Sequence, residues 1–205
     1  MRYAFTTSRS GTGRNKKSEG IQGLIMMRKV ITIQLHQECR MSLANWLSTN
    51  TNRNAKIMRS WFKQIVVAVE YIHKKADIKP GNILVTYDSR LKICDLGLAA
   101  AIQNDDECEE WRTSVGSMLY RSPEQHHLYD QRVDIFAMGL ILIEMCAVVS
   151  PDERFRIFTR IRQGLLIDIL QDQPDALNLA TKLTKIDRNE RPAMKEILRH
   201  PFFKK

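Results

Sequence analysis

The chain has 205 residues, of which 43 % are hydrophobic and 27 % are charged, a balance typical of a globular protein rather than a disordered or fibrous one. This length suits one domain, or one domain with a tail, and suffices for a self-standing core. The longest apolar run, residues 135–149, contains Glu144 and is too short to span a membrane, so we expect no membrane association.

The N-terminal segment carries most of the net charge of +9. Residues 1–30 hold seven Lys or Arg and one Glu, a surplus of six that leaves three for the remaining chain. No folded binding motif accompanies this charge, which favours a basic, disordered tail over 1–28. Binding to RNA or anionic lipid is the alternative, but we do not expect nucleic acid to be a partner. Residues 29–36 then alternate aliphatic and polar side chains, as a strand does.

Two helices are expected next. Residues 41–47 suggest a short helix opened by Ser42, and residues 55–73 predict a long amphipathic helix. Its apolar residues recur every three or four positions and form a stripe that we expect to face inward. This stripe comprises Ile57, Trp61, Ile65, Val69 and Ile72.

A hairpin and a long polar stretch follow. Residues 82–88 and 91–97 resemble two short strands joined by a polar turn at 88–90. The stretch 98–130 is polar and too long for an ordinary connection, so it suggests a functional loop. Beyond it we predict helices at about 133–147, 151–163, 173–184 and 192–199. The fold class is therefore mainly α, with one hairpin.

The cysteines indicate a reducing compartment. Their wide, irregular spacing fits no zinc, redox or disulfide framework, and the N-terminus lacks a secretory hydrophobic region. We expect the chain to be cytoplasmic, with the nucleus as the alternative. The four cysteines are Cys39, Cys94, Cys108 and Cys146.

A constellation suited to phosphoryl transfer lies around the hairpin. Asp77, Lys79 and Asn82 stand together in "DIKPGN", and Asp95 follows thirteen residues after Asn82. A carboxylate can take a proton from a hydroxyl, and an ammonium can steady the transferring group. An amide oxygen and a second carboxylate are ligands suited to Mg²⁺. In isolation, Asp-Ile-Lys-Pro would more often be a plain turn, and Asp95 would be compatible with an ordinary acidic residue in a loop.

Five ordered motifs give this constellation a family resemblance. "DIKPGNIL", "KICDLGLA", "GSMLYRSPEQ", "VDIFAMGLILIEM" and "DRNERP" occur in the order of the C-terminal lobe of eukaryotic protein kinases. Within that superfamily the chain most resembles the Ser/Thr kinases of the α-subunit of initiation factor 2. The resemblance covers roughly 29–203. It implies a truncated kinase domain over 29–205, with a last N-lobe strand, a hinge and the C-lobe with its active-site hairpin.

The resemblance assigns roles to the constellation. Asp77 matches the catalytic base and Lys79 the phosphate-contacting lysine. Asn82 and Asp95 match the metal ligands that hold Mg²⁺ and, with it, ATP. Leu96 replaces the usual phenylalanine after the metal-binding aspartate, an apolar exchange that should preserve packing.

Further matches are structural or regulatory. Glu124 is expected to pair with Arg191, and Asp134 to hold the catalytic-loop backbone. Ser117 stands at the usual loop threonine. Thr113 and Ser114 are candidate phosphorylation sites, because a phosphate there can order a loop against arginines. Two solvated hydroxyls are an equally good interpretation of these last two residues.

The sequence also departs from the family pattern. "GTGRNKKSEG" is not the Gly-rich step G-x-G-x-x-G, and nothing resembles the N-lobe lysine or its glutamate partner. About four residues, including the His-Arg pair, are missing before Asp77. Because one lost charge-stabilising contact typically costs ~10²–10³ in rate, we expect the isolated chain to transfer little phosphate.

Three functions remain open at this point. The first is a Ser/Thr kinase of translation control that acts on a protein substrate, with the initiation factor 2 α-subunit as a candidate, and that needs the missing lobe from another chain. Association with another kinase is a further candidate partnership. The second is a catalytically impaired pseudokinase whose helix at 151–163 and its surroundings dock a protein partner. The third, an RNA-binding adaptor, depends only on residues 1–30.

Overall fold

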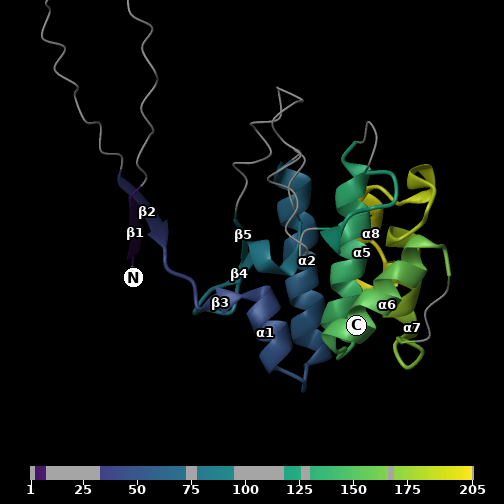
Figure 1. Cartoon of the computed structure of the whole chain (residues 1–205), viewed down its shortest axis with the longest axis horizontal. Helices are drawn as coiled ribbons and strands as arrows, with labels where there is room; N and C mark the ends of the chain where they lie inside the picture. Colours follow the sequence, from purple (N-terminus) through teal and green to yellow (C-terminus); the bar gives the residue numbers. More distant parts are fainter. Residues whose placement is uncertain are drawn as a thin grey trace, which may run out of the picture. The chain divides into compact units, whose positions relative to one another are not determined.

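The computed structural model of the chain divides into two compact units, Met1–Glu38 and Cys39–Lys205 (Figure 1). The structure describes residues 3–7, 33–72, 78–94, 118–125, 130–165 and 169–204.

The first unit contains a pair of antiparallel strands. Strand β1 (Tyr3–Thr7) pairs with β2 (Ile33–Gln37), with Tyr3 opposite Gln37 and Thr7 opposite Ile33. The strand expected at 29–36 is thus present with later bounds, but the expectation of irregular chain at the N-terminus is wrong for residues 3–7. Residues 3–7 read YAFTT and do not alternate apolar with polar side chains, so this stretch gives no strand signal. The expected boundary near residue 28 lies outside the described residues.

The second unit begins with a short strand that leads directly into a helix. Strand β3 (Met41–Ser42) was not predicted, because two residues carry no periodicity. Helix α1 (Leu43–Thr49) was predicted and starts where expected: the Ser42 hydroxyl caps it by accepting a hydrogen bond from the Asn45 N–H at 3.2 Å. Such a cap satisfies one of the four backbone donors at a helix start.

Helix α2 (Ala55–Ile72) is the long amphipathic helix that the sequence predicts, but its buried face is shifted. Ile57 is 44 % exposed, so its placement in the inward stripe is wrong, and Ile72 is only partly buried. The helix buries adjacent pairs such as Trp61 and Phe62, and the centre of so wide a face passes through Met58 instead. The buried residues are Met58, Trp61, Phe62, Ile65, Val66 and Val69.

The predicted hairpin forms the middle of a small sheet. A 3₁₀ turn, η1 (Pro80–Asn82), precedes β4 (Ile83–Val85), which pairs antiparallel with β5 (Leu91–Ile93). The unpredicted β3 pairs with the other side of β4, giving the order β3-β4-β5. The Thr86 hydroxyl closes the turn, because it accepts from the Arg90 N–H at 2.9 Å.

Four helices complete the unit near their predicted positions. They are α5 (Arg132–Cys146), α6 (Pro151–Arg162), α7 (Pro174–Leu183) and α8 (Met194–Leu198). Helix α8 is shorter than expected, and two further 3₁₀ turns, η3 (Arg188–Glu190) and η4 (Pro201–Phe203), flank it. None of the helices described is long and apolar enough to cross a membrane.

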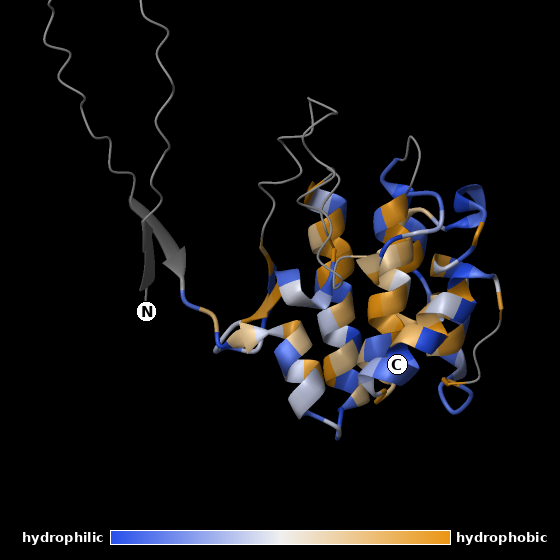
Figure 2. Ribbon diagram, viewed as in Figure 1, coloured by the Kyte–Doolittle hydropathy of each residue, from blue (hydrophilic) through white to orange (hydrophobic). Residues whose placement is uncertain are grey.

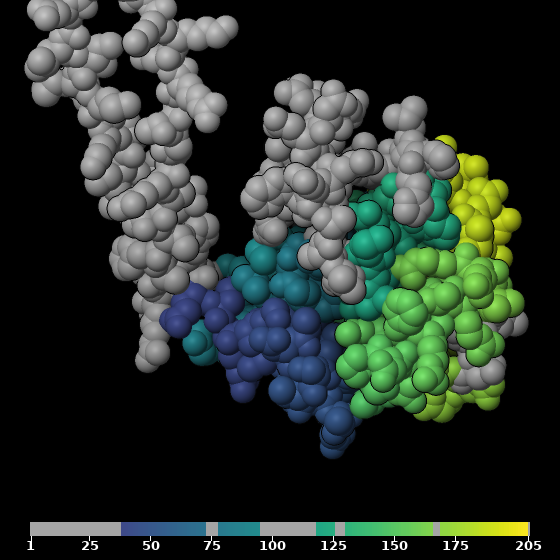
Figure 3. Space-filling model, in the orientation of Figure 1, coloured from purple at the N-terminus to yellow at the C-terminus, as the bar shows by residue number. Residues whose placement is uncertain are grey.

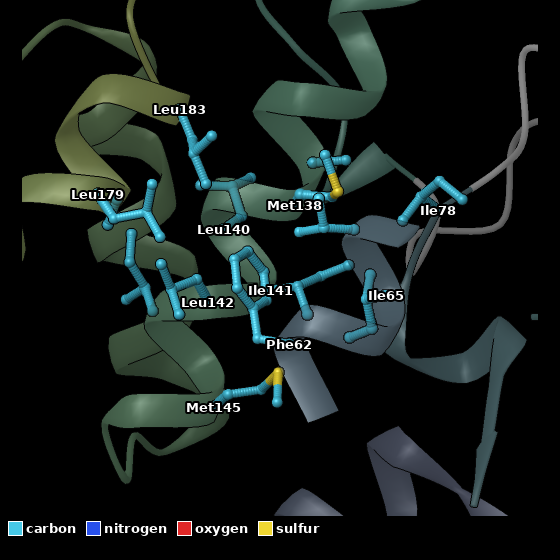
Figure 4. Packing of buried hydrophobic residues seen from close by; sticks show 14 of the residues in the cluster. Phe62, Ile65, Ile78, Met138, Leu140, Ile141, Leu142, Met145, Leu179 and Leu183 are labelled. Carbon is cyan, nitrogen blue, oxygen red and sulfur yellow. The ribbon is translucent and has the colours of Figure 1, made fainter. Parts of the chain in front are cut away.

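Helix α5 is the centre of the core. It is buried on every side from Val133 to Met145 and coloured as apolar along most of its length (Figure 2). Side chains of α2 and α7 reach it from two directions (Figure 4). Gly139 permits the contact with α7: a Cβ there would lie 2.5 Å from Thr184 Cγ2 and 2.9 Å from Leu183 Cβ. The prediction of a mainly α fold is confirmed for the described residues.

Candidate active site

Two of the predicted site residues lie at the turn η1: Lys79 immediately precedes it and Asn82 ends it. Asn82 is only 8 % exposed, and its N–H donates to the carbonyl of Lys79 at 2.9 Å. Pro80 occupies the first position of the turn, where its fixed φ is favourable and its missing N–H costs nothing. The sequence "KPGN" therefore folds locally into a rigid step that positions Asn82 at the start of β4.

The residue that follows β5 is hydrogen-bonded to the last residue of the turn η1. The Cys94 N–H donates to the Asn82 carbonyl at 2.9 Å, and the Cys94 thiol lies 3.3 Å from the same oxygen. Asp95 is the next residue along the chain and lies outside the described residues, as does Asp77. An Asn amide and an Asp carboxylate form an all-oxygen donor set, which fits Mg²⁺. Asn82 is thus held beside the residue that precedes the second predicted ligand.

Two side chains of α2 anchor the hairpin, and sequence reasoning missed both of these roles. The Trp61 indole N–H donates to the Ser89 carbonyl at 2.8 Å, and Gln64 Oε1 accepts from the Leu91 N–H at 2.9 Å. Trp46 packs edge-on against Trp61 with ring centroids 4.8 Å apart. The orientation of the hairpin, and with it of Asn82, therefore depends on α2.

The structure brings Glu124 and Arg191 together as expected. The Arg191 guanidinium donates to both Glu124 carboxylate oxygens, at 2.5 and 2.9 Å. It also donates to the carbonyls of Lys185 and Arg132, at 2.8 and 2.9 Å, and lies 4.9 Å over the ring of Phe136. The Arg191 side chain is fully buried, so its charge is compensated by the bidentate pair and by these carbonyls.

The pair sets the protonation state of Glu124. Partial burial would raise the pKa of this carboxyl, but the hydrogen bonds and charge of Arg191 outweigh that effect and lower the pKa below its usual value. Glu124 is therefore ionised at neutral pH, and the pair holds the chain that leads to α5.

A second buried polar network links Tyr120 to the far end of α5. Glu144, on α5, accepts a hydrogen bond from the Tyr120 hydroxyl and an ion-pair contact from Arg154 Nη1 at 2.5 Å. Burial, followed by the charge of Glu144, raises the pKa of Tyr120 and keeps the phenol protonated. The signal was visible in the sequence: a carboxylate within an apolar run needs a buried partner.

The remaining predicted residues are placed as follows. Asp134 is buried (4 % exposed) in the first turn of α5; the backbone before Lys79 that it is predicted to hold, residues 73–77, is outside the described part. Thr113, Ser114 and Ser117 also lie outside it. Their roles stay predictions.

The protein kinase domain model matches residues 21–203. The chain therefore belongs to the protein kinase family, and its mainly α architecture is that of the family's C-terminal lobe.

Similar curated proteins narrow this assignment. The chain is 34 % identical over 185 residues to the eukaryotic translation initiation factor 2-alpha kinase pek-1 of Caenorhabditis elegans, covering 78 % of this chain and 17 % of that protein. It is 36 % identical over 168 residues to the interferon-induced, double-stranded RNA-activated protein kinase of Rattus norvegicus, covering 77 % and 32 %. The resemblance to initiation factor 2 α kinases is thus confirmed. The chain spans about a third or less of these relatives' length.

Proposed function

We propose that this chain is the metal- and substrate-binding lobe of a Ser/Thr protein kinase that acts in translation control. In this proposal Asp77 takes the proton of a protein hydroxyl and Lys79 steadies the transferred phosphoryl group. Asn82 and Asp95 would hold Mg²⁺, which would neutralise negative charge on the phosphates of ATP. The names of the similar kinases suggest the substrate class, and the initiation factor 2 α-subunit is the first candidate.

One observation carries the proposal. The Asn82 carbonyl accepts the Cys94 N–H, so the turn that ends at Asn82 is bonded to the residue that immediately precedes Asp95 in sequence. Positioning accounts for most of phosphoryl-transfer catalysis, and a rigid step of this kind supplies it.

The test measures phosphate transfer from ATP to the purified initiation factor 2 α-subunit in the presence of Mg²⁺. Incorporation that disappears in Asp95→Asn supports the proposal. Asp88→Asn is the matched control: Asp88 lies at the turn of the same hairpin, with its side chain 61 % exposed, and its loss should leave transfer unchanged. If both variants abolish transfer, the hairpin has unfolded and the metal assignment loses its support.

Nucleotide binding gives a second measurement. Saturation of the chain 100-fold above the dissociation constant should stabilise it by about 2.7 kcal/mol, and this gain should require both Mg²⁺ and Asp95. Absence of any stabilisation at millimolar ATP, together with absence of transfer, would refute the catalytic proposal.

A second candidate, a non-catalytic docking module, is favoured by the outer face of α6. Phe155 is 63 % exposed there, and Arg156 beside it is also exposed. The helix is fixed at its start by a capping box between Ser150 and Glu153, and its outer side is uncovered in Figure 3. An exposed aromatic next to a cation suits a protein partner with an acidic rim.

Binding of the initiation factor 2 α-subunit without ATP tests this candidate. Phe155→Ser should weaken binding at least tenfold. Val148→Ser removes a similarly exposed apolar side chain (55 %) outside α6 and should leave affinity unchanged. Equal affinity for Phe155→Ser and the wild-type chain would eliminate α6 as the docking surface.

A further inference from the structure

The inner face of α6 packs against residues 118–124. These residues are called the 118–124 segment. Arg154, Phe158 and Arg162 are spaced by four and therefore share one face of the helix. Arg154 binds Glu144, the same carboxylate that accepts the Tyr120 hydroxyl. The Phe158 ring meets the Tyr120 ring edge-on, with centroids 5.6 Å apart. Arg162 contacts the backbone of the segment directly.

The 118–124 segment has little regular structure of its own. Among its described residues, a backbone bond joins the Arg121 N–H to the Met118 carbonyl at 3.3 Å, and another joins the Gln125 N–H to the Ser122 carbonyl at 3.2 Å. Bonds of this length are weak. Side chains from other elements must therefore fix the conformation of the segment.

Three such side chains divide the segment between them. Arg191 holds its end through Glu124, and Glu144 holds its middle through Tyr120. Arg162 holds its beginning. This beginning lies within residues 98–130, the stretch that the sequence predicts to be a functional loop.

The guanidinium of Arg162 binds several carbonyls at once. Its Nε donates to the Arg121 carbonyl at 3.0 Å, and its Nη2 donates to the carbonyls of Leu119 and, at 3.4 Å, Met118. Its Nη1 donates back to the Phe158 carbonyl at 3.0 Å, which fixes the plane of the group. Only a rigid planar fork reaches acceptors in these directions, and a lysine ammonium cannot replace it.

This arrangement is costly for an arginine. Burial lowers the pKa of Arg162, and within the part of the chain that the structure describes it forms no ion pair. Among the described residues, the groups that compensate its charge are backbone carbonyl dipoles. An arginine that faced solvent would avoid this desolvation. The cost therefore indicates that the contact between Arg162 and the segment has a structural role.

We propose that Arg162 is a positioning residue: it fixes the backbone of residues 118–121 so that the segment, with the half-exposed Met118 side chain (48 %), is preformed for contact with a protein substrate. The inference has two parts. The substrate part, that the segment is preformed for contact with a protein substrate, rests on the proposed function. The local part, that Arg162 rather than global stability fixes this backbone, stands on the contacts alone.

The local part is tested by native-state amide hydrogen exchange. In Arg162→Met the amides of Arg121 and Ser122 should exchange at least tenfold faster, while the slowest amides of α5, which report global unfolding, change much less. Arg162→Lys should behave like Arg162→Met. Arg160→Met removes an exposed arginine from the same helix and should match the wild type.

The substrate part is tested by steady-state kinetics with the initiation factor 2 α-subunit. Arg162→Met should raise the KM for the protein at least tenfold, with the KM for ATP and the slope of the metal dependence unchanged, and Arg160→Met should have no effect. If the wild-type chain transfers no phosphate, the proposed function fails and takes the substrate part with it, while the exchange pattern still decides the local part. Uniform acceleration of all amides, or rescue by Arg162→Lys, would overturn the role assigned to Arg162.

Discussion

Replacing Gly139 by alanine is expected to destabilise the second unit, although alanine is the better helix former. The added Cβ would lie 2.5 Å from Thr184 Cγ2 and 2.9 Å from Leu183 Cβ. The Thr184 methyl cannot simply rotate away, because the hydroxyl on the same Cβ donates to the Ala180 carbonyl at 2.9 Å and β-branched side chains are stiff. Helices α5 and α7 must therefore move apart.

The magnitude follows from two opposing effects. Overpacking a core typically costs about 1–3 kcal/mol, and two contacts this short place Gly139→Ala at the upper end. The gain in helix propensity from glycine to alanine is about 1 kcal/mol. The net loss in the free energy of unfolding is therefore roughly 1–2 kcal/mol, which corresponds to about 2–4 °C in Tm per kcal/mol for a unit of this size.

Urea denaturation monitored by circular dichroism measures this loss. Gly81→Ala is the matched control, because no atom lies within 4 Å of the Cβ it would add, and its midpoint should stay close to the wild type. Thr184→Ser removes the nearest clashing methyl and should recover part of the loss in the double variant, by at least about 0.5 kcal/mol of coupling. A Gly139→Ala chain as stable as the wild type would show that α5 and α7 do not approach as described.

Three further predictions concern buried polar groups. Arg191→Met should cost about 3–5 kcal/mol, because Glu124 is left without its partner, whereas Arg90→Met, whose ion pair is exposed, should cost less than about 1 kcal/mol; urea midpoints compare the two. Acidification should destabilise the folded chain through His200. Burial, and then the charge of a nearby lysine, lowers the pKa of His200 in the folded state below 6.5. The stability that neutral His200 contributes is therefore complete above about pH 6.5 and is lost as the pH falls through the folded-state pKa. Urea midpoints of the wild type and His200→Asn, measured over a series of pH values, test this. A wild-type chain that alone became more stable below pH 6 would contradict the prediction. Arg53→Met should loosen the ends of α1 and α5 together, since this side chain donates to carbonyls of both helices; faster exchange at one end only would contradict the link.

The sequence predicts those parts of the fold that are marked by a regular spacing of apolar residues or by characteristic turn residues. Helix α2 and the hairpin were found because apolar spacing and turn residues mark them. The exposed Ile57 was misplaced because helical periodicity fixes a face only to within about one residue. Strand β3 was missed because two residues cannot show a period; its partner β4 determines it.

The candidate site divides in the same way. The pair Glu124 and Arg191 could be predicted from a motif. The position of Glu144 within an apolar run indicates that its carboxylate has a buried partner. The contacts of Arg162 could not be predicted, because its partners are backbone carbonyls, which every residue possesses and no side chain reveals. The close approach at Gly139 likewise depends on how two helices cross, a property of the packed core rather than of either segment.

The burial of α5 on all sides has a consequence for synthesis. The helix is nearly continuous in apolar side chains, and the elements that cover it come from both earlier and later parts of the chain, α2 before it and α7 after it (Figure 4). While the ribosome has released residue 146 but not yet residue 183, one side of this rod faces water. An exposed apolar surface of this kind favours aggregation, so we expect this unit to be most prone to aggregate in the interval before α7 is synthesised.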